Sequence, residues 1–291
     1  MTSRSPGLSI RPLVNATWEY GCRYGGNHCG SKSFGKNGMS SLSSRVGSRP
    51  FSLRRSLGNL AKSIEVRWSL ATHDTDSLLR RRFNRWAKQG RGESMEQHHT
   101  PIAEAMWKRM ELSATDRILE LGCGEGWACR LMAHRAGPGC SVVGIDISNE
   151  MICRARDKSR SLRNVSYHCG SAHQIPGPDS YFTKVVSIEA FYYFERQDQV
   201  LKELLRAVKP GELYLLMCLY RDDPKAEGWF EDVGLPVHNR SMTEYEDMLR
   251  RAGWVDVNSQ VFEFRTDPFG KRDAHDRPLL VTARKPCLAG S

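Results

Sequence analysis

Three glycines and one carboxylate give the strongest chemical signal in this chain of 291 residues. Residues 120–126 read ELGCGEG, so glycine recurs at every second position after an apolar run. Backbone without side chains can turn sharply and let a ligand lie against it. Asp146 comes twenty residues after Gly126, at the end of a second apolar run, and a carboxylate there can accept hydrogen bonds from vicinal ribose hydroxyls. Together these residues predict a site for a nucleoside.

Two nucleoside cofactors fit such a bend. A dinucleotide site usually reads G-x-G-x-x-G, with its pyrophosphate at a helix N-terminus. Here the third glycine comes one residue early, and Glu120 and Glu125 bring negative charge that would repel a pyrophosphate. S-adenosylmethionine carries an ammonium and a sulfonium, which tolerate nearby carboxylates. The bend therefore favours S-adenosylmethionine over NAD. The alternative without function is a structural strand-to-helix bend, with Asp146 as a helix cap.

Alternating strands and helices must position these residues. Short apolar runs predict strands at residues 118–121, 142–145, 165–169, 185–188 and 213–219. Helices are expected between them, including one over residues 200–208 that Pro210-Gly211 ends. Two later runs, 255–264 and 279–283, could pair as closing strands. The pattern predicts an α/β fold, a Rossmann-like doubly wound and mostly parallel sheet, whose ligands bind at the carboxyl ends of the strands.

Helix caps can be predicted outside the strands. Residues 79–112 have a helical pattern, in which Thr100 is expected to cap an N-terminus and Pro101 to occupy the first turn. Near the end of the chain, Ser241 and Glu244 form a capping-box pair, and Gly253 is expected to close that helix.

At this point the chain resembles the class I S-adenosylmethionine-dependent methyltransferases, over about residues 80–286. Residues 118–124 (ILELGCG) resemble the family's first motif, and residues 143–148 (VGIDIS) its second. Residues 170–172 are similar to the turn where the family contacts adenine, with Ser171 where the family often has Asp. Residues 185–194 resemble the fourth strand and its exit. The resemblance implies one set of cofactor-binding residues: Glu120, Gly122, Gly124, Gly126, Asp146, Ile147, Ser171, Ala172, Glu189 and Ser94.

Ser94 enters this set through the segment before the core. Trp86 and residues 90–95 (GRGESM) look like the aromatic-plus-glycine approach of small-molecule branches, including sterol, tocopherol and cyclopropane-forming enzymes. By that resemblance, residues 76–112 form an N-terminal helical lid, and Ser94 lies over the cofactor. An ordinary loop serine is the alternative.

The sequence assigns no catalytic base. Methyl transfer from a sulfonium depends mainly on alignment, and a base is needed only where the acceptor holds its proton at neutral pH. Many relatives carry His where this chain has Tyr193, and a tyrosine with a pKa near 10 is a poor base. Tyr192 or Tyr193 could instead orient an acceptor, face the sulfonium, or pack in the core. His173 and Tyr193 are weak catalytic candidates, and His98, His99 and His238 are weaker still.

The charge of the body argues against nucleic acid. The net charge of the chain is +10, but residues 1–64 hold ten basic residues against one acid, so the rest is close to neutral. A neutral body offers no footprint for phosphates. We therefore expect methyl transfer to a small organic acceptor, in which residues 221–239 could wall the acceptor pocket. The alternatives are a catalytically silent cofactor-binding protein that acts through a partner, and an NAD-dependent oxidoreductase, which the glycine spacing disfavours. The oligomeric state is not predicted.

The remaining expectations concern the ends of the chain. Residues 1–68 form a basic, Ser-rich and acid-poor tail expected to be disordered, with a short amphipathic helix over residues 53–64. Such a tail is typical of an organelle transit peptide cleaved near Arg67-Trp68, or of a non-native extension. The protein is expected inside the cell, in mitochondria or plastids if the tail directs import and otherwise in the cytoplasm. Residues 113–286 form the core and 287–291 a short tail, and neither a metal site nor a membrane span is predicted.

Overall fold

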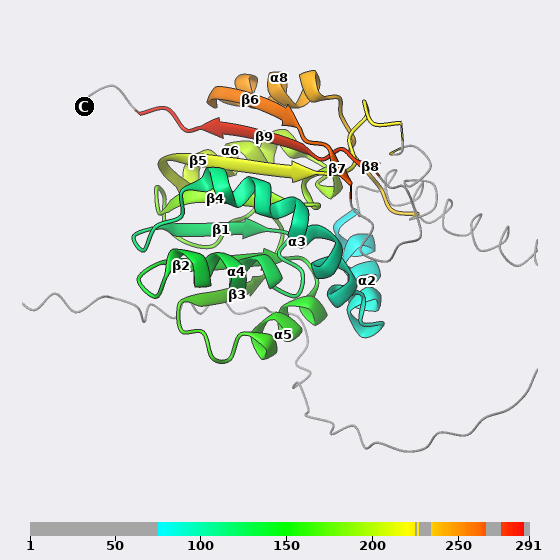
Figure 1. Cartoon of the computed structure of the whole chain (residues 1–291), viewed down its shortest axis with the longest axis vertical. Coiled ribbons are helices and arrows are strands. Elements are labelled where there is room, and N and C mark those ends of the chain that lie inside the picture. Colours follow the sequence, from blue (N-terminus) through cyan, green and yellow to red (C-terminus); the bar gives the residue numbers. More distant parts are fainter. Residues whose placement is uncertain (1–74, 225, 227–233, 266–274, 288–291) are drawn as a thin grey trace, which may run out of the picture.

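The computed structural model describes residues 75–224, 226, 234–265 and 275–287. Their main feature is a seven-stranded sheet with helices on both faces (Figure 1). The strands of this sheet are β1 (Arg117–Leu121), β2 (Ser141–Asp146), β3 (Val165–Cys169), β4 (Phe182–Ile188), β5 (Val208–Met217), β6 (Val255–Val261) and β9 (Leu279–Arg284). The helices are α2 (Thr75–Lys88), α3 (Arg91–Met110), α4 (Trp127–Ala136), α5 (Asn149–Lys158), η1 (Phe191–Tyr193), α6 (Gln197–Ala207) and α8 (Met242–Ala252). Two short strands, β7 (Phe264–Arg265) and β8 (His275–Asp276), pair separately.

The strand order is β3-β2-β1-β4-β5-β9-β6, and β9 alone runs antiparallel to its neighbours in this sheet. The chain moves outward from β1 to β3 and then returns to β4 on the other side of β1. The order therefore reverses between β1 and β4, the place where such sheets bind ligands. This confirms the predicted fold class, and the antiparallel pairing of β6 with β9 confirms the expected closing strands.

The helices divide between the two faces. The apolar sides of α3 and α4 pack in one buried cluster, which includes Met106 and Met132. Those of α6 and α8 pack in the other, which includes Leu204 and Leu249. Because both faces are covered, the central strands carry nearly continuous apolar runs rather than an alternating pattern.

The lid consists of two helices where the sequence predicted one capped at Thr100. Gly90, in a left-handed conformation with φ 72°, separates α2 from α3. Thr100 and Pro101 lie inside α3, and the Thr100 hydroxyl donates to the carbonyl of Glu96. The prediction of an N-terminus at Thr100 was therefore wrong. A threonine hydroxyl inside a helix can donate to the carbonyl four residues earlier, so a Thr-Pro pair is not unique to helix starts.

The other predicted caps are confirmed. Ser241 and Glu244 make both hydrogen bonds of a capping box, and Gly253 closes α8 with φ 101°. Strand β5 begins earlier than the sequence predicted, at Val208 instead of Leu213. It includes Gly211, whose missing side chain lets the strand lie close to β4: a Cβ there would stand 2.2 Å from the carbonyl oxygen of Thr183.

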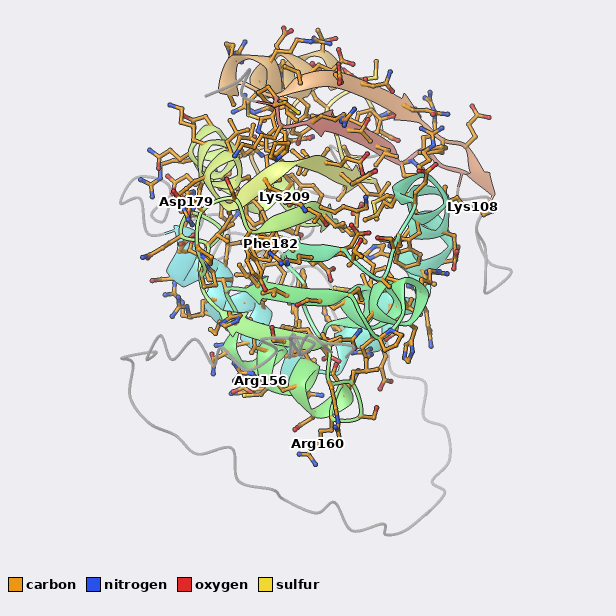
Figure 2. All side chains as sticks on the ribbon, turned by 90° about the vertical axis from the view of Figure 1, so that its left-hand side faces the viewer. Lys108, Arg156, Arg160, Asp179, Phe182 and Lys209 are labelled. Atoms are coloured by element: carbon orange, nitrogen blue, oxygen red, sulfur yellow. The ribbon has the colours of Figure 1, made fainter. Side chains whose placement is uncertain are left out.

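The two ends of the sheet differ. Figure 1 shows α2 beside the tips of the strands, at their carboxyl ends. Figure 2 shows the opposite end, where Phe182 begins β4 and Lys209 lies near the start of β5. Within the part of the chain that the structure describes, no helix has the length and apolarity to cross a membrane. In the same residues, no group of three or more metal-binding side chains is found.

Several predictions lie outside the described residues. They are the disordered tail over residues 1–68, its amphipathic helix and cleavage site, and most of the tail 287–291. The same holds for much of the segment 221–239, which was expected to wall an acceptor pocket.

Candidate active site

The glycine turn joins β1 to α4 and has three residues in the left-handed region: Gly122, Gly124 and Gly126, with φ of 70°, 52° and 73°. The amides of Gly122 and Cys123 both donate to the carbonyl of Ile145, at 2.8 and 3.0 Å. The turn is thus fixed to the adjoining strand β2. At Gly124 a Cβ would meet no atom within 4 Å, so the backbone there is open for a ligand.

Asp146 connects the turn to the end of β2. Its Oδ2 accepts from the amide of Gly124 at 2.9 Å, and its Oδ1 accepts from the amide of Ser148 at 2.8 Å. Burial raises the pKa of this carboxyl, and the two backbone hydrogen bonds oppose the rise. A carboxylate has about four lone-pair directions, so capacity for two more donors remains. The side chain is therefore oriented by the protein before any ribose arrives.

Glu120 lies below the turn and is 2% exposed. Burial raises its pKa from 4.5 to about 7, although the Cys129 thiol donates to its Oε2 at 2.8 Å and lowers it. Near neutral pH this carboxyl is therefore poised between its two forms. A cationic group bound above it would favour the ionised form.

Gly126 allows close packing of the turn rather than contact with a ligand. A Cβ there would stand 2.3 Å from the hydroxyl of Tyr167, and the residue does not line the cavity described below. The preceding Glu125 is 3% exposed, forms an ion pair with Lys158 at 2.6 Å, and lies directly beneath Gly92 of α3. These two residues pack the turn against its surroundings.

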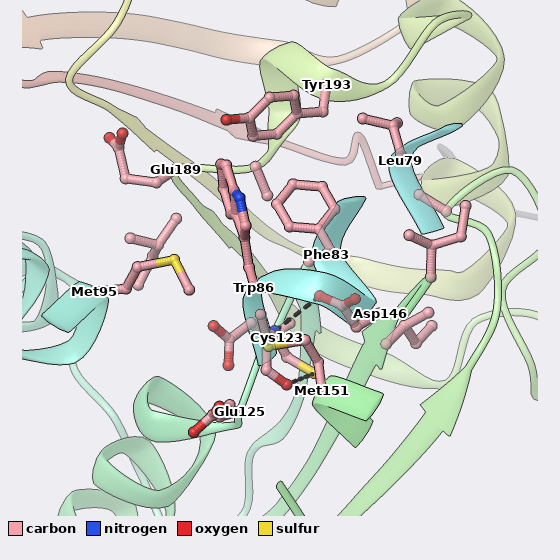
Figure 3. Close-up of a pocket in the computed structure, with 18 of the residues that line it drawn as sticks. Leu79, Phe83, Trp86, Met95, Cys123, Glu125, Asp146, Met151, Glu189 and Tyr193 are labelled. Atoms are coloured by element: carbon pink, nitrogen blue, oxygen red, sulfur yellow. Dashed lines mark hydrogen bonds between the residues drawn. The ribbon is translucent and has the colours of Figure 1, made fainter. Parts of the chain in front are cut away.

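One cavity, of about 500 Å³, unites the predicted site (Figure 3). Apart from Gly126, every predicted site residue lines it, from four strand ends and the lid: Glu120, Gly122, Gly124, Asp146, Ile147, Ser171, Ala172, His173, Glu189, Tyr193 and Ser94. In Figure 3, Asp146, Met151 and Leu79 lie on one side of the cavity, and Glu189 and Met95 lie on the other. The first side holds Asp146, which is predicted to accept from the ribose hydroxyls, and the second holds Glu189, which the resemblance also implies for the cofactor.

The turn after β3 belongs to the first side. The amide of Gly170 donates to the carbonyl of Asp146 at 2.9 Å, and the hydroxyl of Ser171 lies 2.9 Å from Nδ1 of His173. Burial lowers the pKa of His173, so its ring is neutral at pH 7, and its Nε2 is buried without a hydrogen-bond partner in the structure. Contact of Ser171 with adenine stays a prediction.

The exit of β4 forms the second side. Glu189 has φ 54°, an unusual value for a residue with a side chain, and its amide donates to the carbonyl of Leu216 at 2.9 Å. Its carboxylate accepts from the Tyr192 hydroxyl at 3.0 Å and from the amide of Cys218. Burial raises the pKa of both Tyr192 and Tyr193, which keeps their hydroxyls protonated. Tyr193 is therefore even less suited to be a base than its residue type predicts.

The chain is similar to known methyltransferases. A family model described as a methyltransferase domain matches residues 118–211. The methyltransferase GfsG of Streptomyces halstedii is 30% identical over 113 residues, which cover 38% of this chain and 40% of the relative. The malonyl-[acyl-carrier protein] O-methyltransferase of a Marinomonas strain is 31% identical over 131 residues, 44% of this chain and 48% of the relative. The chain thus spans about half the length of the curated relatives it matches first.

Solved structures agree. The methyltransferase-type partner in a complex with the Haloferax volcanii Trm112 methyltransferase activator has a TM-score of 0.64 and 27% identity, over 70% of this chain and 98% of that one. A SAM-dependent methyltransferase from Aquifex aeolicus has a TM-score of 0.53 and 23% identity, over 69% of this chain and 97% of that one, and shows likeness of fold. The chain carries a class I S-adenosylmethionine-dependent methyltransferase domain.

In this methyltransferase domain the lid contributes residues that the sequence did not assign. Leu79 and Phe83 of α2 line the cavity with Trp86, and His98 and His99 of α3 line it as well. The helix start expected at Thr100 would leave both histidines outside the helix, but α3 begins nine residues before Thr100 and includes them, with His98 exposed. The spacing of Leu79, Phe83 and Trp86 at three and four residues was a usable signal for one helix face.

Asn84 is a second unassigned residue of the lid. Its Oδ1 accepts from the hydroxyl of Ser148 at 2.7 Å and from the amide of Glu150 at 3.3 Å. Ser148 itself caps α5 by accepting from the amide of Met151. Helix α2 is thereby fixed to the loop that follows Asp146. No signal in the sequence links residues 84 and 148, because the contact depends on the docking of α2.

Proposed function

We propose that this protein transfers a methyl group from S-adenosylmethionine to a small organic acceptor. The observation that carries the proposal is the joint geometry of Gly124 and Asp146, an open backbone bend bonded to an oriented carboxylate at the switch point of the sheet. The family match and the methyltransferase names of the relatives support the same reaction.

The residues of the site fit this cofactor. Gly124 leaves room for a ligand against the backbone, and Asp146 keeps two lone-pair directions for ribose hydroxyls. Five carboxylates line the cavity, which suits the ammonium and sulfonium of the cofactor and disfavours the pyrophosphate of NAD. When bound, S-adenosylmethionine supplies an activated methyl group. We assign to this chain the tasks of holding the adenosyl part at Asp146 and the turn, and of enclosing the acceptor beneath α2 and α3.

No base is assigned. The histidine candidate, His173, follows the turn after β3, where its Nδ1 lies 2.9 Å from the Ser171 hydroxyl. We expect His173→Ala to retain most methyl transfer activity, measured as S-adenosylhomocysteine formed with an active acceptor. A loss of about a hundredfold or more is typical for removal of a general base and would assign that role to His173.

The first experiment is calorimetry on the full chain with S-adenosylmethionine, S-adenosylhomocysteine and NAD. We expect binding of the first two and none of NAD. The second experiment incubates protein and cofactor with a cell extract and searches by mass spectrometry for metabolites that gain one CH₂ unit. Tight binding of NAD, or of no nucleoside, would contradict the proposal.

A partner-dependent function is the second candidate. It is favoured by one observation, that the structural neighbour of 27% identity was solved with a methyltransferase activator. Cofactor binding without turnover of any metabolite in the extract, together with a stable complex isolated from cells, would support it.

A further inference from the structure

The side of the cavity formed by the exit of β4 differs from the side with Asp146, because it combines aromatic rings with one carboxylate, Glu189. Phe83 lies edge to face with Trp86 and with Tyr193, at centroid distances of 5.2 and 5.3 Å. Tyr192 and Tyr193 have ring centroids 4.6 Å apart. All four rings and Glu189 line the same cavity (Figure 3).

Glu189 is held toward this cavity by the protein. Its backbone has a strained left-handed conformation, and a hydrogen bond from its amide to the Leu216 carbonyl fixes it there. Such strain persists only where surrounding contacts impose it. Its two oxygens accept from the Tyr192 hydroxyl and the Cys218 amide, both of which orient the carboxylate. Burial keeps Tyr192 protonated, so this donor is permanent, and the carboxylate retains lone pairs for a ligand.

The charges that line the cavity disfavour an anionic acceptor. They are the carboxylates of Asp76, Glu120, Glu125, Asp146 and Glu189, and the guanidinium of Arg91. Among the described lining residues Arg91 is the one Arg or Lys, and its guanidinium lies over the Trp86 ring at 5.1 Å. A carboxylate or phosphate acceptor would therefore be repelled, whereas ring faces and carboxylates attract cations.

From these observations we propose that the acceptor is a small amine, bound by its nitrogen between the Glu189 carboxylate and the aromatic wall of Phe83, Trp86, Tyr192 and Tyr193. This inference rests on the proposed methyl transfer function, and it names the substrate class of that site.

The reaction itself explains why these groups suit an amine. The amine arrives at the reaction as the free base, having lost its proton to water. Its lone pair forms a bond to the methyl carbon while the carbon–sulfur bond breaks and its electron pair returns to sulfur. The positive charge therefore moves from sulfur to nitrogen. Glu189 and the ring faces stabilise that charge as it develops, which lowers the barrier more than it strengthens ground-state binding.

Oxygen acceptors lack this match. A neutral hydroxyl would need a base, but carboxylates are weak bases, and burial holds Tyr192 and Tyr193 protonated. A carboxylate acceptor needs no base. However, its negative charge is repelled by the neighbouring carboxylates, which disfavours its binding.

Three probes of nearly equal size and different charge test the inference: benzylamine, benzyl alcohol and benzoate. Each is titrated by calorimetry into the full chain saturated with S-adenosylhomocysteine. We expect benzylamine to bind about tenfold or more tightly than the alcohol, since it can form a charge-assisted hydrogen bond, and benzoate to show no binding.

Glu189→Gln keeps the shape of the side chain and removes its charge. We expect it to weaken benzylamine binding about tenfold, and to weaken benzylamine binding more than it weakens S-adenosylhomocysteine binding. Asp198→Asn is the matched control, since it removes an exposed carboxylate of α6 outside the cavity lining, and it should change neither. If Glu189→Gln weakens both ligands alike, the carboxylate serves the cofactor, and the inference is overturned.

A second measurement does not depend on the choice of probe. The protein, deuterated-methyl S-adenosylmethionine and a cell extract are incubated, and fragmentation of each labelled product locates the methyl group. A label on nitrogen supports the inference, and a label on oxygen or carbon overturns it while leaving the methyl transfer intact. No labelled product would count against the proposed methyl transfer itself. Failure of the wild type to bind S-adenosylhomocysteine would also reject the proposed function, so the two failures are distinguishable.

Discussion

The two walls of the cavity are built differently. The core wall, which comprises residues 120–126 and Asp146, consists of strand ends whose backbone amides bond to one another and to a single carboxylate. The lid wall, helices α2 and α3, reaches the core through side chains such as Asn84 and through the close contact of Gly92 with Glu125. The backbone hydrogen bonds of the core wall are part of the sheet and cannot break without disrupting it, whereas the side-chain contacts of the lid wall can break one at a time. The comparison indicates a rigid cofactor platform under a separable cover.

The largest effect is expected where the core wall has no space. In Gly122→Ala the new methyl would stand 2.3 Å from Cβ of Ala190, at a φ of 70°. Overpacking and the left-handed conformation together should lower the free energy of unfolding by about 2–4 kcal/mol. Denaturant unfolding measures this change.

Gly124→Ala is the matched control for that variant, because its φ is 52° but nothing lies within 4 Å. It should cost stability of only about 1–2 kcal/mol, from the backbone conformation, and should abolish cofactor binding. Equal losses of stability in the two variants would show that space is not the difference between them.

The second effect concerns the buried carboxyl of the core wall. Burial raises the pKa of Glu120 from 4.5 in the unfolded chain to about 7, so the folded state holds this proton more tightly. The stability of the wild type should therefore fall as pH rises from about 4.5 to 7, and the full cost applies above pH 7. Glu120→Gln, which still accepts from Cys129, should be roughly 2–3 kcal/mol more stable than the wild type at pH 8 and about equal to it near pH 4.5.

Thermal or denaturant unfolding of both proteins at the two pH values checks this. Glu93→Gln, which removes a carboxylate with 78% exposure from the lid, serves as control and should show no such pH dependence. A stabilisation by Glu120→Gln that is the same at both pH values would mean that ionisation is not its cause.

The third effect is on binding. Asp146→Ala removes the acceptor predicted for the ribose hydroxyls and frees the amides of Gly124 and Ser148. We expect S-adenosylhomocysteine binding to weaken by about 1–3 kcal/mol, roughly 5- to 150-fold. Calorimetry measures it, and a dissociation constant within twofold of the wild type would remove Asp146 from the proposed site.

The smallest effect is expected on the lid. In Gly92→Ala the methyl would stand 2.2 Å from Cδ of Glu125, so the carboxylate must shift away from Lys158 or α3 must lift. We expect a local loss of about 1 kcal/mol, seen as faster hydrogen exchange in α3, with global unfolding little changed. In the background of Glu125→Ala the same substitution should cost less, and an undiminished cost would place the clash elsewhere.

The core of the domain, which includes the core wall, is also the part that the sequence predicted best. The strands of residues 118–121 and 165–169, the capping box at Ser241 and the cavity-lining position of Asp146 depend on local patterns, because apolar runs and glycine spacing act within a few residues. The lid was predicted less well. Whether α3 starts at Gly90 or Thr100, and whether Asn84 meets Ser148, depends on packing between elements far apart in sequence. Such contacts leave no local signal.

Asn84 also bears on the way ligands enter and leave. Its oxygen completes the cap of α5, so undocking α2 would leave the Ser148 hydroxyl and the Glu150 amide without their acceptor. The N-terminal half of helix α3 is attached by ion pairs, such as Arg130 with Glu96 at 3.3 Å, and follows Gly90, where a Cβ would meet no atom within 4 Å. The C-terminal half of α3 packs in the buried cluster. We therefore expect ligands to enter and leave by an outward movement of the N-terminal half of α3 about Gly90, while α2 and the buried half of α3 stay in place. On that view, the strength of a few surface charges governs how fast spent cofactor departs.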